Sequence, residues 1–218
     1  GTELIPLALT KDVVEITKDV PGRIIKTSYG VSVLVTNIPS TGATLHMKQK
    51  EFTNNDLFGV VKSGISISAT GGDIALKFYS DDTNCAVYFE ENGQLQFVPS
   101  LYVPEKKAFI ADISKPGNYY LIRVSSVDLP NQSELSYFAV KWLTERMLID
   151  ADFYGSINAQ ATTKDLLDLI KKVFGVTLSD PNGNQVITGK QAEKLINEAL
   201  NRVNISWIDK NKMHSWLD

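Results

Sequence analysis

Short apolar runs separated by turn residues dominate the chain from residue 4 to about residue 127. The runs are rich in β-branched and aromatic residues and are bounded by Gly, Pro or Asn, which is typical of β-strands. They cover residues 31–35, 64–69, 74–79, 87–98, 108–111 and 119–124. Because several such strands follow one another without helical periodicity, we expect an antiparallel β-sandwich.

Two of the predicted connections carry specific turn residues. Asn92 and Gly93 interrupt the run at 87–98, and both residue types tolerate the positive φ angles of a type I′ turn. We therefore expect a hairpin with its tip at these two residues. Pro116 and Gly117 mark a further turn before the last strand.

The spacing of apolar residues changes near 128–131, where steps of three and four residues replace alternation. This spacing is typical of amphipathic helices. The first predicted helix would bury a face made of Leu135, Phe138, Ala139, Trp142, Leu143 and Met147. A short last helix would begin near Asp209 and include Trp216.

Two further helices are predicted, each opened by a capping box. Thr162 precedes Asp165 by three residues, and Thr188 precedes Gln191 by three, so each pair can satisfy free backbone N–H groups. The apolar positions are Leu166, Leu169, Ile170, Val173 and Phe174 in one helix, and Ala192, Leu195, Ile196, Ala199, Leu200 and Val203 in the other. We expect Leu195 and Ile196 to be core residues.

These patterns predict an α+β chain of two domains. Residues 1–128 would form the antiparallel β-sandwich, and residues 129–218 a small all-α domain with its own core. With 218 residues and 43% apolar content, the chain can bury both cores.

Charge and cysteine content exclude several classes of protein. The net charge is −3 with both signs spread along the chain, so we expect no nucleic-acid partner, which normally meets a basic face. The single cysteine, Cys85, excludes an internal disulfide. No run of 18 apolar residues exists, so we expect no membrane insertion.

The helical half resembles the S-layer homology (SLH) family of Gram-positive cell-surface proteins. Residues 139–149 (AVKWLTERMLI) are similar to the family's first helix, residues 161–166 and 187–192 to its second helix start, and residues 207–216 to the start of a next repeat. The resemblance implies an SLH-like helical domain and an extracellular location on a bacterial cell surface. Strand-rich domains often precede SLH segments, which agrees with the order of the two halves.

Departures from the family pattern bear on binding. Thr163 and Gly189 stand where the family has the arginine that grips anionic wall polymer, and Met147 stands where it has a glycine. A bidentate arginine contact is hard to replace. We therefore expect cell-wall polymer or other surface proteins to be bound weakly or not at all, and Thr163→Arg with Gly189→Arg to restore anchoring if an anchor was lost.

The function expected from these features is a non-catalytic cell-surface or cell-envelope module with a structural, display or adhesion role. His46 and His214 stand outside any catalytic motif, and Cys85 lacks an activating motif. The carboxylate pairs at 81–82 and 90–91 are expected to be solvated, and neighbouring strand residues face opposite ways. The sequence thus predicts no enzyme, no catalytic residue and no cofactor.

The segment 180–191 places oxygen-bearing residues at several positions of a calcium loop. The turn glycine and the bidentate glutamate of such loops are here Gln185 and Gln191. We therefore expect no metal site, and a plain turn that leads into the capping box at Thr188.

The alternative function is a carbohydrate- or protein-binding β-sandwich module of a larger secreted protein. It would use an exposed aromatic platform, against the common arrangement in which aromatic residues fill the core and shield the strands. The candidate residues are Phe78, Tyr79, Tyr88, Phe89, Tyr119 and Tyr120.

Overall fold

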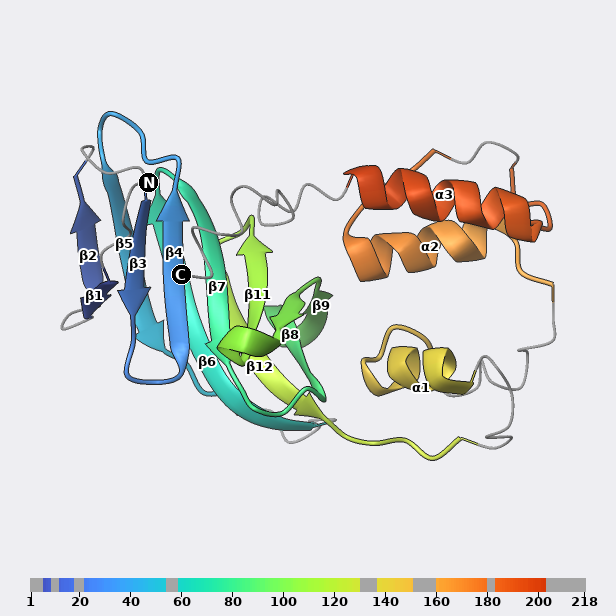
Figure 1. The fold of residues 1–218 in the computed structure, drawn as a ribbon, viewed down its shortest axis with the longest axis horizontal. Helices are drawn as coiled ribbons and strands as arrows, with labels where there is room; N and C mark the ends of the chain where they lie inside the picture. The colour runs from blue at the N-terminus through green and yellow to red at the C-terminus, as the bar shows by residue number, and fades with distance from the viewer. Residues whose placement is uncertain are drawn as a thin grey trace. The chain divides into compact units, whose positions relative to one another are not determined.

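The computed structural model describes residues 6–8, 12–17, 22–53, 59–129, 137–150, 160–179 and 183–202 (Figure 1). Contacts divide the chain into two compact units, and the change between them falls between Val124 and Ser125. The described strands belong to the first unit and the described α-helices to the second. The separate folding of residues 1–128 and 129–218 stays a prediction.

The described strands of the first unit form two six-stranded sheets, in which the pairs are antiparallel except for β1 with β3. One sheet has the order β1-β3-β4-β7-β11-β10 and the other the order β2-β5-β6-β12-β8-β9. The strands are β1 (Pro6–Ala8), β2 (Val13–Ile16), β3 (Gly22–Lys26), β4 (Val31–Thr36), β5 (Ala43–Gln49), β6 (Gly59–Thr70), β7 (Asp73–Tyr79), β8 (Cys85–Glu91), β9 (Gln94–Val98), β10 (Leu101–Val103), β11 (Ala108–Ile113) and β12 (Gly117–Val124), with a short 3₁₀ helix at Pro104–Lys106.

The main core lies between the two sheets. Buried side chains of the first sheet, such as Val33 and Leu76, belong to one cluster with buried side chains of the second, such as Leu45, Ile65 and Leu121. Alternation along each strand places these residues inward, as a half-buried sheet requires. The described strands therefore form a sandwich-like arrangement, and the coarse α+β prediction is confirmed.

The predicted hairpin is present, and β8 joins β9 through Asn92 and Gly93. Their φ angles are 54° and 75°, the left-handed conformation that a type I′ turn needs at both positions. The one parallel pair, β1 with β3, is a detail that the sequence pattern did not predict.

The second unit contains three described helices, α1 (Tyr137–Glu145), α2 (Thr163–Phe174) and α3 (Gly189–Arg202). The helices α2 and α3 lie side by side (Figure 1) and share a core of Ile170, Leu178, Leu195 and Ala199. Helix α1 has a separate small core. None of the described helices is long and apolar enough to cross a membrane.

The buried face predicted for α1 is wrong. Phe138 is 77% exposed and Trp142 is 41% exposed, whereas Tyr137 and Val140 are buried against Leu129. The helix has only nine residues and ends at Glu145. In so short a helix, one turn of contact with residues 127–129 decides which face is buried, and that contact cannot be read from periodicity.

In α3 the prediction holds for Leu195, which is 5% exposed, and fails for Ile196, which is 37% exposed. Leu200 is also half-exposed. The helix contacts α2 along a narrow face containing Leu195 and Ala199, so the neighbouring apolar positions stay outside it. Predictions for Leu135, Val203 and residues 207–218 lie outside the described residues.

Candidate functional site

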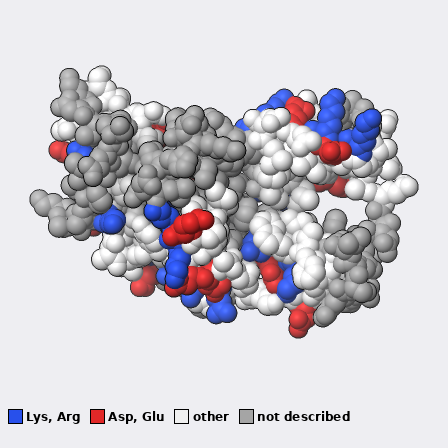
Figure 2. Space-filling model, in the orientation of Figure 1, with Lys and Arg blue, Asp and Glu red and all other residues white. Residues whose placement is uncertain are grey.

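On the face of the molecule shown in Figure 2, the described residues form no patch of a single charge. There, Lys and Arg side chains lie among Asp and Glu side chains on the described surface. Cross-strand register, by contrast, brings polar side chains together beside two cavities.

Four polar side chains stand in register across the outer face of the sheet that contains β5, β6, β12 and β8. Lys48 pairs with Ser66, Ser66 with Asn118, and Asn118 with Glu90. Their sequence neighbours Met47, Ile67, Tyr119 and Phe89 point into the main core, so these four point outward. We call Lys48, Ser66, Asn118 and Glu90 the polar row.

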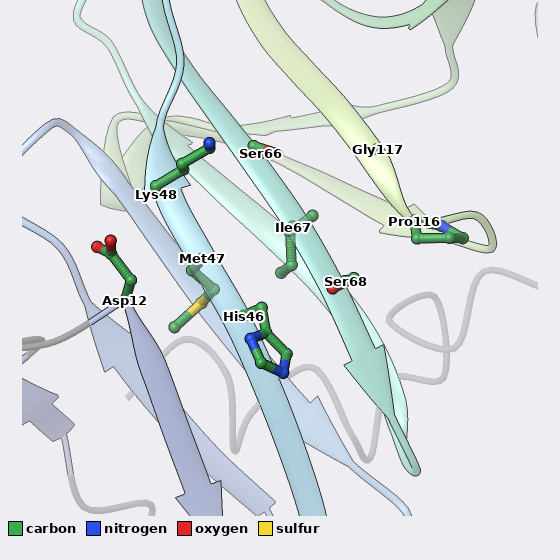
Figure 3. Close-up of a pocket in the computed structure, with 9 residues that line it drawn as sticks. All are labelled: Asp12, His46, Met47, Lys48, Ser66, Ile67, Ser68, Pro116 and Gly117. Carbon is green, nitrogen blue, oxygen red and sulfur yellow. The ribbon is translucent and has the colours of Figure 1, made fainter.

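A cavity of about 460 Å³ opens at the β5–β6 end of this row, and we call it the trough. Four side chains line it: His46 and Lys48 from β5, and Ser66 and Ser68 from β6. Asp12 lies on one side and Pro116 on the other (Figure 3).

The floor of the trough is backbone. Met47 and Ile67 also line it, but their side chains are buried in the main core, so they contribute main-chain atoms. Asp12 is fixed there because its carbonyl oxygen accepts a hydrogen bond from the Met47 amide at 2.6 Å. The floor is therefore held in place by backbone hydrogen bonds and by side chains buried in the main core.

His46 lies opposite Ser68 in this trough. In the described part of the sheet no hydrogen bond joins the two side chains. The trough offers hydrogen-bonding groups of several kinds, which suits binding.

Glu90, at the other end of the polar row, is held by its neighbours. Its Oε2 accepts a hydrogen bond from the Tyr120 hydroxyl at 2.7 Å and another from Asn118 Nδ2 at 2.9 Å. The bond from Tyr120 is the main reason that the pKa of Glu90 is lowered. Burial, followed by this bond to a carboxylate, raises the pKa of Tyr120. Glu90 is thus a fixed anion beside a cavity of about 270 Å³ that Lys50 and Phe52 also line.

Comparison with models of protein families, with curated proteins and with solved structures found no match.

The carboxylate pairs have separate partners. Glu91 pairs with Lys115 at 3.2 Å, away from the Glu90 network. Asp81 pairs with Lys107 at 2.7 Å, and Asp82 with Arg123 at 2.9 Å. The prediction that Glu90 and Glu91 do not share one cleft agrees with these contacts.

The aromatic platform of the alternative prediction is wrong in its membership. Phe78, Tyr88, Tyr119 and Tyr120 are each at most 3% exposed, and of the six candidates Tyr79 is the most accessible, at 41%. Phe78 and Tyr119 fill the main core, while Tyr88 and Tyr120 belong to a second cluster on the outer face of the sheet, which we call the outer aromatic cluster. The polar row lies beside that second cluster, a juxtaposition that only cross-strand register reveals.

Cys85 is a buried core residue. Burial raises the pKa of its thiol, and its Sγ lies 3.8 Å from the Ser80 hydroxyl. A thiol nucleophile needs a lowered pKa and access to solvent, and Cys85 has neither.

In the second unit, the first of the two positions at which the SLH pattern has an arginine is inaccessible. Thr163 is 1% exposed, its amide donates to the Gln185 carbonyl at 2.8 Å, and its hydroxyl donates to the same oxygen at 3.3 Å. Gly189, the second such position, is exposed at the start of α3 with open space around it. The position at Thr163 is therefore buried, whereas the position at Gly189 is open to solvent.

In the described part of segment 180–191, two oxygen-bearing residues make contacts within the protein. The Gln185 carbonyl is taken by Thr163, and Gln191 Oε1 accepts from the amide and hydroxyl of Thr188, both at 2.9 Å. Among the described residues, no group of three or more His, Cys, Asp or Glu side chains could hold a metal ion. Asp180 itself lies outside them.

Proposed function

We propose that the chain is a non-catalytic module of a bacterial cell surface, in which the helical unit carries the β-sandwich for display or adhesion. The resemblance of residues 139–149, 161–166 and 187–192 to the SLH family supports the location. The observation that supports the structural role is that hydrogen bonds within each unit hold the chain on both sides of the boundary between Val124 and Ser125.

On the sandwich side, the connection is anchored at Val124, the last residue of β12. Its amide donates to the Asn84 carbonyl at 3.0 Å, and its carbonyl accepts from Asn84 Nδ2 at 3.3 Å. The Val124 side chain is buried in the outer aromatic cluster. Both backbone polar groups and the side chain of this residue are therefore engaged.

On the helical side, two charged residues of α1 hold the segment that follows. Lys141 Nζ donates to the Ser126 hydroxyl at 2.8 Å and to the Val127 carbonyl at 2.6 Å. Glu145 Oε1 accepts from the Val127 amide at 3.2 Å and pairs with Lys141 at 2.6 Å. Leu129 is then buried with Tyr137 and Val140. Only Ser125 separates the two anchored stretches.

The Glu145 carboxylate is buried, so it needs these partners to stay charged. Burial alone would raise its pKa, but the hydrogen bonds from Lys141 and the Val127 amide outweigh burial and the pKa is lowered. Within the helical unit, the segment that follows Ser125 is therefore tied down by an ion pair and by bonds to its main chain, which suits a display module.

Hydrogen exchange tests the connection. We expect the Val127 amide to be protected in the unmodified chain and to exchange at least tenfold faster in Glu145→Gln. Glu198→Gln is the matched control, because Glu198 also forms an i,i+4 pair, with Arg202, but at an exposed site on α3. Equal Val127 exchange in the unmodified chain and in Glu145→Gln would refute the proposed anchoring.

The surface location has its own tests. Antibodies against the purified chain should label intact cells of the bacterium that makes it, and labelling that appears only after lysis would overturn this location. In a sacculus pull-down beside a complete three-repeat SLH protein, we expect weak or no retention of this chain. Strong, salt-sensitive retention would show that the chain is itself an anchor rather than a displayed module.

A further inference from the structure

We propose that the trough on the outer face of the sandwich is a binding site for a neutral oligosaccharide, with the polar row as its continuation. This inference does not depend on the cell-surface role. It rests on the residues that line the trough, on their charges and on their register across four strands.

The mixture of charges selects the ligand class. Lys48 supplies a cation at the trough, and Asp12 supplies a carboxylate on its side wall. A simple anion would be attracted by Lys48 and repelled by Asp12. A simple cation would be attracted by Asp12 and repelled by Lys48. A sugar hydroxyl both donates and accepts hydrogen bonds, so neighbouring hydroxyls of one ring satisfy Lys48, Asp12 and the hydroxyls of Ser66 and Ser68 together.

The register of the row favours a chain of sugars over a single one. Neighbouring strands lie about 4.8 Å apart, so the three strand steps from Lys48 to Glu90 extend the polar surface by about 14 Å. Asn118 and Glu90 are fixed by their mutual hydrogen bond and by Tyr120. Fixed hydrogen-bonding groups lose little conformational entropy on binding, which favours affinity.

An aromatic side chain at the Glu90 end of the polar row also offers apolar contact to a ligand. Phe52 is half-buried and lines the cavity beside Glu90, with its ring edge against Tyr120 at a centroid distance of 5.2 Å. Sugar rings have apolar faces that pack on aromatic side chains. An oligosaccharide lying along the row from the trough would end near this ring.

The test is an NMR titration of the complete, ¹⁵N-labelled chain with cellohexaose and with chitohexaose, each up to 10 mM. We expect shift changes of backbone amides at His46, Lys48, Ser66 and Ser68, continuing to Asn118. Lys48→Met should weaken binding at least fivefold, because it keeps the apolar stem of the side chain and removes the charge. Lys62→Met, an exposed β6 residue outside the trough lining, is the matched control and should bind as the unmodified chain does.

Several outcomes would overturn the proposal. These are an absence of shift changes with both sugars, changes confined to residues outside the trough and the polar row, or an equal loss of binding in Lys48→Met and Lys62→Met. Inorganic phosphate at the same concentration serves as the ionic probe, and we expect it to leave the four trough amides unchanged. If phosphate binds there and the sugars do not, the trough is an anion site and the oligosaccharide assignment is wrong. Because the Val127 exchange experiment uses different residues, its result stands apart from this one.

Discussion

The Tyr120 hydroxyl donates a hydrogen bond of 2.7 Å to the Glu90 carboxylate, across the pairing of β12 with β8. Tyr120 is fully buried, while Glu90 is only partly buried. The bond therefore joins the outer aromatic cluster to the polar row, and it fixes the position of the one carboxylate in that row.

Replacing Tyr120 by Phe should lower the free energy of unfolding by about 1 kcal/mol, since a bond to a charged acceptor is lost at a partly solvated site. The measurement is urea denaturation at pH 7. Tyr119→Phe is the control, because that hydroxyl donates to the neutral Lys115 carbonyl. A larger loss in Tyr119→Phe than in Tyr120→Phe would show that the charge of Glu90 does not strengthen the bond.

Acid should weaken the sandwich through the same carboxylate. The pKa of Glu90 is lowered in the folded protein, so its contribution to stability is present above the pKa of the unfolded chain and is lost as the pH falls through the folded value. Between pH 5 and pH 3, Glu90→Gln should therefore lose less stability than the unmodified chain. Denaturation curves across this range give the comparison, and parallel pH dependences would contradict it.

Gly64 should tolerate no side chain. A Cβ at this position would collide with the Lys50 carbonyl oxygen and lie 2.7 Å from Cδ1 of Tyr120. We expect Gly64→Ala to cost roughly 2 kcal/mol or more, as overpacking does. Gly189→Ala, at an open position in α3, should instead be neutral or stabilise by up to about 1 kcal/mol. Thermal unfolding of both variants decides this, and a stable Gly64→Ala would mean that both the Lys50 backbone and the Tyr120 ring can shift.

Two neighbouring residues of α3 should behave differently when truncated. Leu195→Ala should cost about 2–5 kcal/mol because the side chain is buried between α2 and α3. Ile196→Ala should cost about 1 kcal/mol or less, because this side chain is more than one-third exposed. The test is denaturation followed by a probe in the helical unit. Similar losses would mean that both sides of α3 are packed.

Thr163→Arg should not restore wall anchoring, contrary to the expectation from sequence. The side chain is buried and bonded to the Gln185 carbonyl, so an arginine there would displace the segment before α3. We expect a loss of about 2 kcal/mol or more, whereas Gly189→Arg should fold normally. Retention of the Gly189→Arg variant on sacculi, compared with the unmodified chain, then tests whether an anchor was lost. A stable Thr163→Arg variant would show that Thr163 is not confined as described.

Calcium should not raise the melting temperature of this protein. The side chains at two ligand positions of the calcium-like segment, Thr188 and Gln191, are already bonded to each other and to each other's backbone amides. Melting curves with 5 mM calcium and with a chelator should coincide. A clear increase with calcium that disappears in Asp180→Ala would reverse this prediction.

The sequence by itself determined the local structure wherever the signal is short-range. Asn92 and Gly93 form the hairpin turn because only neighbouring residues decide whether positive φ is tolerated. Thr162 and Asp165 form the capping box because both groups belong to one helical turn. The strand runs and the change of period near 128–131 likewise gave the α+β class.

The tertiary structure alone decided which faces are buried and which polar residues meet. Phe138 and Trp142 have the spacing of a buried face, yet contact with residues 127–129 turned α1 so that Tyr137 and Val140 are covered instead. Lys48 and Glu90 are 42 residues apart in the chain, and pairing of four strands placed them in one row. Burial and register depend on the sum of many weak contacts between distant segments, whereas a local pattern records only the preferences of neighbouring residues.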